Sequence, residues 1–299
     1  MKDPRETFAR TVTELLDEDL STALVYAEIS GQYFADAARR HPDRVVNVGI
    51  REQLLLNVGA GLALAGMRPI VHTFASFLVE RPFEQIKLGF NHQDVGGVLV
   101  SVGGSVDVSS GGRTHQSPGD VALLDTLADW TVHVPGHSDE VADSLRQAVA
   151  GDGRHYVRVV GQQNGVAFPV RRGRMHVVRR GSGATVVAVG PMLDPVLQAV
   201  EGLDLTVVYA NTVRPFDARG LRAVLGSKEV VLVEPYLAGT SARVVAEALR
   251  DVPHRLLALG IGREELRRYG TPEEHLAARG LDAAGLRRSI TGFLGAVAA

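Results

Sequence analysis

The chain of 299 residues lacks cysteine, which excludes disulfide bonds and thiolate metal sites. It also lacks an excess of one charge, because 32 lysine and arginine residues against 34 acidic residues give a formal net charge of −2. We therefore expect neither nucleic acid nor a membrane surface as a partner. No apolar run approaches the ~20 residues that span a bilayer, and the polar residues 1–11 carry no export signal, so we expect a cytoplasmic protein.

Histidine is present ten times, but not in a pattern that holds a metal ion. None lies in a His-Glu-x-x-His arrangement, and His133 and His137 flank the turn Pro135-Gly136, so we expect both in a loop. No metal ligands are predicted in this chain. What the sequence does contain is 45% hydrophobic and 22% charged residues, a composition typical of globular proteins and sufficient here for two domains.

Strand and helix patterns alternate in the first half of the chain. A helical spacing of apolar residues over 5–18 is followed by short apolar runs that predict strands at 24–27, 45–48, 69–72, 97–102 and 131–134. Helices are predicted at 52–65, 82–89, 120–127 and 138–150. This alternation indicates a mostly parallel sheet covered by helices, in a first domain of residues 1–160.

The second half repeats the alternation after an aperiodic stretch. Residues 161–183 include a basic cluster at 171–174, and we expect them to form the interdomain linker. Beyond them, strands are predicted at 184–189, 205–209 and 230–233, with helices at 195–201, 218–225 and 241–249. The fold class is therefore α/β, with two doubly wound domains of mostly parallel sheets, the second at residues 184–299.

Glu52 is the first candidate for chemistry. It follows a predicted strand and a glycine turn in residues 49–53 (Gly-Ile-Arg-Glu-Gln), a position where open α/β sheets hold ligands. By itself it is better interpreted as a helix N-terminal acid that the helix dipole stabilises. The functional interpretation of Glu52 is strengthened by other candidate residues that follow it along the chain.

Two aromatic residues, Phe74 and Phe77, end the strand after Glu52 in a chain with only 5% aromatic residues. Arg81 begins the sequence Arg-Pro-Phe-Glu-Gln, and His115 lies in residues 111–116 (Gly-Gly-Arg-Thr-His-Gln). Taken singly, the two phenylalanines could be core residues and His115 a loop histidine bonded to the backbone.

The ordered set resembles the transketolase family. The pyrimidine-binding domain of that family has Gly-Ile-x-Glu-Gln, then Ser-Thr-Phe with a second aromatic residue, then Arg-Ala-aromatic-Asp-Gln, then Asp-Gly-x-Thr-His-Gln. Residues 211–217 (Asn-Thr-Val-Arg-Pro-Phe-Asp) are similar to its C-terminal Thr-Ile-Lys-Pro-Leu-Asp. The resemblance covers nearly the whole chain, and the combination of motifs is specific although each motif is weak alone.

This resemblance implies a site for thiamine diphosphate. Glu52 would hydrogen-bond N1′ of the cofactor's aminopyrimidine and act as a catalytic residue, while Phe74 and Phe77 would stack on the ring. Ile50 and Arg81 would be further cofactor-binding residues. His115 would be a second catalytic residue and would contact the substrate's hydroxyl groups.

The resemblance covers only half of such an enzyme, which also needs a diphosphate-binding domain with Gly-Asp-Gly and a later Asn that together hold Mg²⁺. Residues 151–153 are Gly-Asp-Gly, but the next Asn, Asn164, is too close, and we expect a surface turn there. The Mg²⁺ ligands would then lie on a partner chain, an N-terminal-half transketolase subunit. We expect activity only with that partner, in an α₂β₂ heterotetramer.

Departures from the family motif concern the substrate. Gly111 stands where the family has Asp, Arg113 replaces Pro or Ala, and after residues 156–158 the chain has Val160-Gly161-Gln162 where the family commonly has a phosphate-binding Arg. An ordinary sugar-phosphate substrate is therefore in doubt. Arg113 could instead bind an acid or a phosphate of the substrate.

Three functions stay open at this point. The first is transfer of a two-carbon ketol unit from a ketose-like donor to an aldehyde-like acceptor. The second, within thiamine chemistry, is a β-subunit-like component of a 2-oxoacid dehydrogenase or a hybrid that loads an acyl carrier. The third is a non-catalytic regulatory subunit that has kept the fold. The motifs favour the first, but they identify neither donor, acceptor, pathway nor partner.

Overall fold

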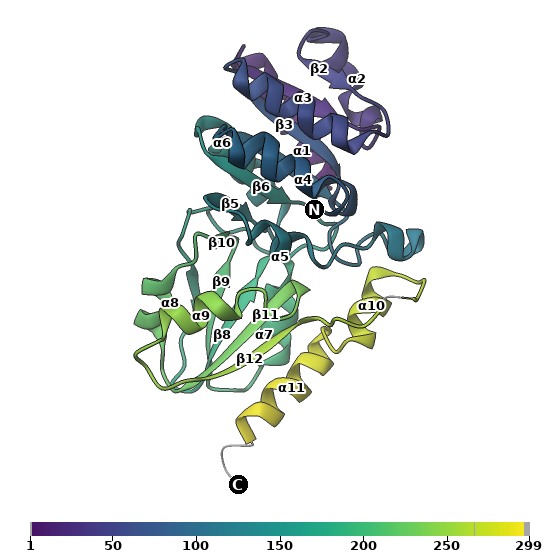
Figure 1. The fold of residues 1–299 in the computed structure, drawn as a ribbon. Coiled ribbons are helices and arrows are strands. Elements are labelled where there is room, and N and C mark those ends of the chain that lie inside the picture. Colours follow the sequence, from purple (N-terminus) through teal and green to yellow (C-terminus); the bar gives the residue numbers. More distant parts are fainter. Residues whose placement is uncertain (1, 266, 296–299) are drawn as a thin grey trace.

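The strands form two separate sheets, one above the other in Figure 1. The computed structural model describes residues 2–265 and 267–295. The upper sheet has seven strands and the lower has five. The two mostly parallel sheets, which pack against helices, confirm the expected α/β fold class.

The seven-stranded sheet has the order β10-β5-β6-β4-β3-β1-β2. All neighbouring strands are parallel except β10, which runs antiparallel to β5. Its strands are β1 (Thr22–Tyr26), β2 (Val45–Asn47), β3 (Arg68–Phe74), β4 (Gly97–Val102), β5 (Trp130–His133), β6 (Arg154–Arg158) and β10 (Thr212–Arg214). Their central residues are buried on both faces, as continuous apolar runs in a covered parallel sheet should be.

Helices cover both faces of this sheet. One face packs against α1 (Pro4–Glu18), α2 (Gly31–Arg40) and α6 (Ser138–Ala150), and the other against α3 (Glu52–Leu64), α4 (Phe83–Gln85) and α5 (Asp120–Leu124). The helix at α2 was not expected from the sequence, whereas α6 has the predicted bounds. This arrangement directs the carboxyl ends of the parallel strands to one edge, where such folds hold ligands.

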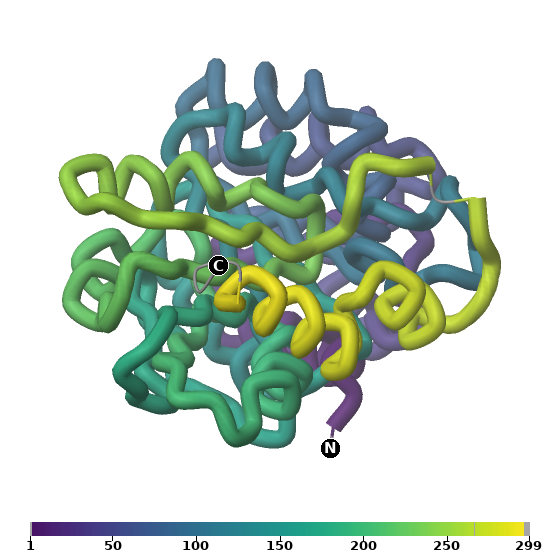
Figure 2. The backbone as a smooth tube through the Cα atoms, turned by 90° about the horizontal axis from the view of Figure 1, so that it is seen from below, coloured from purple at the N-terminus to yellow at the C-terminus, as the bar shows by residue number. Residues whose placement is uncertain are grey.

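The five-stranded sheet has the order β12-β11-β8-β9-β7, with only β7 antiparallel to its neighbour. Its strands are β7 (His176–Arg179), β8 (Thr185–Val189), β9 (Thr206–Ala210), β11 (Glu229–Leu237) and β12 (Arg255–Ile261). On one face lie α7 (Leu193–Ala199) and α11 (Ala283–Gly295), which appears in yellow in Figure 2. The remaining helices are α8 (Ala218–Val224) and α9 (Ala242–Ala248) on the other face, and α10 (Pro272–Ala278).

Two strands complicate the expected division at residues 160 and 183. Strand β7 lies inside the segment expected as a linker and pairs with β9 of the lower sheet. Strand β10 comes from the second half of the chain but pairs with β5 of the upper sheet. The division into residues 1–160, 161–183 and 184–299 stays a prediction. None of the helices in the described residues has the length and apolar character to cross a membrane.

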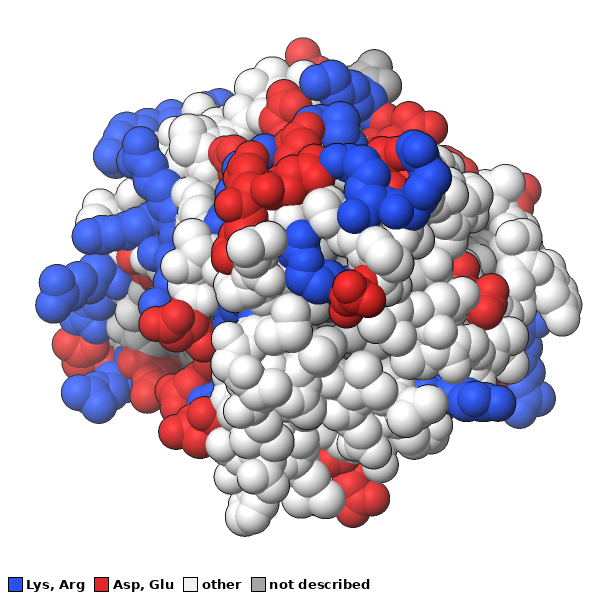
Figure 3. Space-filling view, turned by 90° about the horizontal axis from the view of Figure 1, so that it is seen from above, with Lys and Arg blue, Asp and Glu red and all other residues white. Residues whose placement is uncertain are grey.

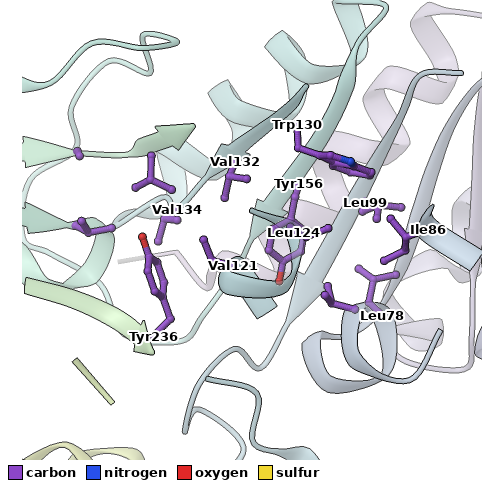
Figure 4. Close-up of a cluster of buried hydrophobic side chains, with 14 of the residues drawn as sticks. Leu78, Ile86, Leu99, Val121, Leu124, Trp130, Val132, Val134, Tyr156 and Tyr236 are labelled. Carbon is purple, nitrogen blue, oxygen red and sulfur yellow. The ribbon is translucent and has the colours of Figure 1, made fainter. Parts of the chain in front are cut away.

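One hydrophobic cluster joins the two sheets. Figure 4 shows Tyr236 of β11 on the side of Val121 and Val134, with Tyr156 and Trp130 of the upper sheet farther along. All belong to a single core that extends from α3 to α9. Burial of apolar surface contributes roughly 25 cal/mol per Å². We therefore expect the halves to unfold together.

The helix expected at 82–89 is part of a longer helical stretch with wider turns. Residues Ser76–Glu80 (η1) and Ile86–His92 (η2) are π-helical, and α4 lies between them. The amide of Arg81 donates to the carbonyl of Ser76 at 3.1 Å, an i→i+5 bond. Wide turns of this kind often occur at functional sites because they re-aim side chains. Here they direct Phe77 and Arg81 toward Glu52.

The expectation of a loop position is wrong for His133. This residue ends β5, is 1% exposed, and stacks on His155 of β6 with ring centres 5.6 Å apart. Its Nδ1 is 3.0 Å from the hydroxyl of Thr212 in β10, so it helps to join the chain's two halves. Pairing with β10 and stacking on His155 keep His133 in the strand, which ends before the turn at Pro135-Gly136. His137 precedes α6 as its N-cap.

Three buried histidines should make the fold less stable in acid. Burial lowers the pKa of His72 and His133 to about 3 and the pKa of His155 to about 4. Below the unfolded value of about 6.5 the unfolded chain binds protons that the native chain does not, so each histidine removes up to about 1.4 kcal/mol per pH unit. Buried Glu234, whose pKa burial raises to about 7, acts in the opposite direction.

The histidine term can be isolated with a variant. His155→Gln should reduce the slope of the unfolding free energy against pH, between pH 6 and 5, by about 1.2 kcal/mol per pH unit, measured by urea denaturation. The exposed His92→Gln is the matched control. A slope that stays equal to that of the parent chain would contradict the assignment.

Candidate active site

Glu52 is the first residue of α3 and is only 3% exposed. Strand β2 ends at Asn47, whose side-chain oxygen accepts the amide of Gly49 at 3.0 Å. Gly49 has a φ of +69°, a conformation that favours glycine, and it allows the chain to turn sharply into α3. Ile50, in this turn, is 73% exposed. The turn therefore places a buried carboxylate beside an exposed apolar side chain.

Arg81 pairs with the Glu52 carboxylate. Its Nη1 lies 2.8 Å from Oε2 of Glu52, and its guanidinium carbon lies 4.0 Å from the centre of the Phe77 ring. A guanidinium over a ring face is attracted by the ring quadrupole. The ion pair and the ring contact together fix Arg81 at the entrance to Glu52.

Three aromatic rings lie in contact with one another beside the Glu52–Arg81 ion pair. The ring of His115 lies 5.1 Å from that of Phe77 and 5.7 Å from that of Phe74, and the two phenylalanine rings are 6.1 Å apart. All three contacts are edge-to-face, the arrangement that aromatic quadrupoles favour. The structure thus brings Glu52, Arg81, Phe77, Phe74 and His115 into one continuous group, although they are separated in sequence.

The loop after β4 positions His115. Its two short turns are Ser109–Gly111 (η3) and Arg113–His115 (η4). The hydroxyl of Thr114 hydrogen-bonds Nδ1 of His115 at 3.0 Å, which orients the ring and leaves Nε2 available for a ligand. A Cβ atom on Gly111 would lie 2.7 Å from Cγ of His115. The glycine therefore permits this position of the ring.

Arg113 points its charge toward other protein groups. Its Nε lies 3.2 Å from the Glu265 carboxylate, and its Nη1 donates to the carbonyl of Gln116 at 2.9 Å. Glu265 belongs to the segment between β12 and α10, which lies beside the η3–η4 loop in Figures 1 and 2. The second half of the chain therefore contacts the loop that carries His115. The substrate role of Arg113 stays a prediction.

Several polar atoms near these residues have no hydrogen-bond partner within the described residues. They are the hydroxyl oxygens of Thr73 and Ser76 and both side-chain amide atoms of Gln116, and all are buried. A buried polar atom without a partner costs about 1–3 kcal/mol. Such a group is explained by a bound ligand or water, so this edge of the sheet has the polar capacity for a ligand.

Sequence reasoning missed the carboxylate of Glu80. Burial raises its pKa, and its Oε1 accepts a hydrogen bond from the Ser117 hydroxyl at 2.9 Å. It directly precedes Arg81, and that proximity was the available signal. Its carboxylate therefore lies beside the His115 loop in surroundings that favour the protonated form more than water does.

It also missed the ion pair of Arg158 and Asp120. Both side chains are fully buried, with Nε of Arg158 and Oδ2 of Asp120 2.7 Å apart. Nη2 of Arg158 donates to the Ser105 hydroxyl at 2.6 Å, and a Cβ atom on Gly104 would lie 2.5 Å from the guanidinium carbon. The pair therefore holds the start of the loop that carries His115.

No group of three or more histidine, cysteine or acidic side chains in the described part of the chain could hold a metal ion. The Gly-Asp-Gly of residues 151–153 lies in a bend between α6 and β6, where Asp152 is exposed. What the site offers is a buried carboxylate with a guanidinium, three aromatic rings and unpaired polar atoms. Such a set suits a flat, partly polar heterocycle.

Comparisons with known families and proteins agree with this geometry. Residues 1–164 match the family described as transketolase, pyrimidine binding domain, and residues 173–286 match transketolase, C-terminal domain. An uncharacterized 33.6 kDa protein in the fasciation locus of Rhodococcoides fascians is 51% identical over 96% of this chain and 94% of its own length.

Two longer relatives match this chain over part of their own length. The 1-deoxy-D-xylulose-5-phosphate synthase of Alkalilimnicola ehrlichii and synthase 2 of Geobacter sulfurreducens are both 31% identical, over 97% and 95% of this chain. The chain spans about half the length of these synthases, 48% of each.

Two solved structures have the same fold. A split gene transketolase, described as an inactive beta4 tetramer, has a TM-score of 0.86 and 27% identity over 98% of both chains. Transketolase from Campylobacter jejuni has a TM-score of 0.78 and covers 97% of this chain with 46% of its own. Its identity of 16% indicates a shared fold alone.

Proposed function

The chain belongs to the transketolase family, and from that premise we propose that it is the C-terminal half of a split, thiamine-diphosphate-dependent transketolase. The observation that carries the proposal is the buried Glu52 carboxylate, faced by Arg81 and the Phe77 ring. The resemblance to a split gene transketolase over 98% of both chains supports a division of the enzyme at this place.

The residues present fit an aminopyrimidine ring. Glu52 would hold a proton at N1′, Phe77 and Phe74 would contact the ring face, and the Ser76 hydroxyl is a buried polar atom without a partner in the described residues. Ile50 and Arg81 would border the ring. When bound, thiamine diphosphate supplies the electron sink for cleavage of a carbon–carbon bond. The role of this chain is to orient it and to move protons.

The diphosphate and Mg²⁺ would be held by a partner that carries the other half of the enzyme. We place the partner's contact on α3, because the cofactor must extend from Glu52 into that partner. Ile50, Leu54 and Leu64 are 73%, 42% and 59% exposed along this helix and its entry. Figure 3 shows a broad area without charged side chains at this end of the molecule. Two copies of each chain would close the assembly as α₂β₂.

The reaction that this site supports best is transfer of a two-carbon ketol unit. His115 has Nε2 free to contact the substrate's hydroxyl groups, while Thr114 fixes its orientation. Glu80, whose pKa burial raises, could hold a proton near the same loop. The donor would be ketose-like and the acceptor aldehyde-like.

Hydrogen exchange at C2 of thiamine diphosphate tests this function. With Mg²⁺ present, we expect slow exchange with this chain alone and an acceleration of about 10² or more when a subunit carrying Gly-Asp-Gly and the spaced Asn is added. The rate is measured by NMR after acid quenching. The partner alone is the matched control.

The exchange measurement, together with a test of which substrates are consumed, also distinguishes the two alternative functions. If a partner binds this chain tightly but exchange stays slow, the chain is a regulatory subunit and the proposed function is wrong. If exchange accelerates but only 2-oxoacids are consumed, the chain acts as a dehydrogenase-type β-subunit instead.

A further inference from the structure

The loop between β4 and α5 carries His115 but has little regular structure of its own. Its backbone hydrogen bonds over residues 108–116 join residues three apart, among them the His115 amide and the Gly112 carbonyl at 3.1 Å. Turns of this 3₁₀ type are short and have poor hydrogen-bond geometry. Gly112 has a φ of +69°, and a glycine backbone is conformationally permissive. We therefore expect contacts from outside the loop to decide where the His115 ring lies.

Glu265 makes the first of these outside contacts. It comes from the segment between β12 and α10, and its Oε1 lies 3.2 Å from Nε of Arg113. Nη1 of the same guanidinium donates to the Gln116 carbonyl at 2.9 Å. The guanidinium therefore closes the turn from the residue two before His115 to the residue directly after it. Glu265 ties this closed turn to the second half of the chain.

Tyr269 makes the second outside contact, at Gly112. A Cβ atom on Gly112 would lie 2.9 Å from Cε1 of Tyr269 and 3.3 Å from Cζ, so a side chain at this position would displace the phenol ring. Tyr269 is 73% exposed, so little of its surface is buried in a core. What its ring does cover is the residue whose carbonyl accepts the amide of His115.

The segment between β12 and α10 is itself held at two places. The Glu264 carboxylate lies 3.6 Å from Nε of Arg279, at the end of α10. At the start of α10, the Thr271 hydroxyl accepts the amide of Glu274 at 3.2 Å, and the Thr271 amide donates to the Glu274 carboxylate at 3.0 Å. This capping box fixes the point at which the chain enters the helix. The two outside contacts therefore come from an anchored segment.

The beginning of the His115 loop also packs on the second half of the chain. Val106 is 3% exposed and belongs to the hydrophobic core of the five-stranded sheet. The second half thus contacts the loop at its start, through Val106, and at the turn of His115, through Glu265 and Tyr269.

We propose that Glu265 and Tyr269 are positioning residues of the active site, which hold the turn at residues 112–116 and with it the orientation of His115. The proposal rests on the proposed function for the contact of His115 with the substrate. The ring of His115 connects them to the site, because it lies 5.1 Å from the ring of Phe77 and 5.7 Å from that of Phe74. The C-terminal domain thereby takes part in catalysis through a residue of the pyrimidine-binding domain.

Modest contacts are sufficient for such a role. The side chains of Arg113 and Glu265 are 45% and 50% exposed, and an ion pair so exposed stabilises a fold only weakly. Catalysis is far more sensitive to position, since a misplacement of about 1 Å can cost about 10²-fold in rate. We therefore expect changes at Glu265 and Tyr269 to alter the site more than they alter the stability of the chain.

The first test follows the His115 ring by NMR in the full chain, with ¹³C-labelled histidine. The Phe74 and Phe77 rings lie edge-to-face with His115, so their ring currents shift the His115 Cε1–H signal, which is assigned by its loss in His115→Gln. Tyr269→Ala should broaden this signal or move it toward the position of an exposed histidine. Tyr269→Phe should preserve it, because the ring over the glycine is kept. Leu20→Ala, which truncates another exposed side chain, is the matched control.

The second test measures turnover in the complete assembly with partner, thiamine diphosphate and Mg²⁺. With L-erythrulose, a small ketose, as donor, kcat/KM should fall about tenfold in Tyr269→Ala and about threefold in Glu265→Gln. C2 exchange should stay within about twofold of the parent value, because it depends on Glu52. The urea midpoint should also be unchanged, whereas a merely structural role would lower midpoint, exchange and turnover together. Glu201→Gln, at an exposed position in the turn after α7, is the control for the change of charge.

Three results would overturn the proposal. They are an unmoved His115 signal in Tyr269→Ala, a Tyr269→Phe variant as impaired as Tyr269→Ala, and a higher kcat/KM in Glu265→Gln. The last would show that Glu265 competes with the substrate for Arg113 instead of holding the turn. Slow C2 exchange with a displaced His115 signal would refute the proposed function alone, because the NMR test requires neither cofactor nor partner. Accelerated exchange with an unmoved signal would refute the positioning role alone.

Discussion

Glu52→Gln should lower C2 exchange in the complete assembly by about 10²–10⁴-fold, the range that positioned acid–base groups contribute. The amide has nearly the same shape but cannot share a proton with N1′ as a carboxylate does. Glu52 is 3% exposed and 2.8 Å from Arg81, so water cannot readily replace it. The exchange rate is measured with the partner and Mg²⁺ present.

Glu84→Gln is the matched control for this variant. It makes the same chemical change a short distance away, at an exposed position in α4. Cofactor binding is measured in parallel, so that a loss of exchange is separated from a loss of affinity. Intact exchange in Glu52→Gln would show that the carboxylate has no catalytic role.

Asp120→Asn should destabilise the chain by about 3–5 kcal/mol, the cost of removing one partner of a buried ion pair. Both side chains are fully buried, so Arg158 would keep its charge without an opposite charge beside it. The amide that replaces the Asp120 carboxylate would also be a weaker acceptor for the hydrogen bonds from Arg158 and from the Tyr156 hydroxyl, which are 2.7 and 2.8 Å long. Since a domain has only about 5–15 kcal/mol of stability, the loss should be visible as a large shift of the urea midpoint.

An exposed ion pair provides the comparison. Asp251→Asn removes the partner of Arg222, where the carboxylate side chain is 62% exposed, and should leave the midpoint nearly unchanged. The double variant Asp120→Asn/Arg158→Met should recover part of the loss, because no buried charge remains. If Asp120→Asn unfolds at the parent midpoint, the pair does not stabilise the fold as inferred.

The fold was predictable where local sequence and burial agree. Strand β4 and helix α6 have the predicted bounds, because a continuous apolar run and a clear helical spacing each indicate one structure. Helix α2 was missed because it buries only two residues, Phe34 and Ala37, so few apolar positions mark it in the sequence. The pairing of β10 with β5 was also missed, because such contacts join residues about 80 positions apart.

The candidate site likewise contains residues that the sequence predicted and residues that only the structure revealed. Glu52, Phe74, Phe77, Arg81 and His115 were identified from short ordered motifs, and the structure brings them together. The buried ion pair of Arg158 and Asp120 gave no signal, because the two residues belong to no motif and meet only when α5 packs beside the end of β6. Arg113 was expected to face the substrate, and its contact with Glu265 comes from the other half of the chain.

By itself the sequence determined the alternation of strands and helices, the transketolase resemblance and the residues expected to meet the cofactor, because these depend on neighbours in the chain. Only the tertiary structure decided which strand completes the upper sheet, which charges are buried together and which segment of the second half contacts the His115 loop. Those features depend on packing between distant segments, where burial makes each charge and hydrogen bond worth far more than it is in water.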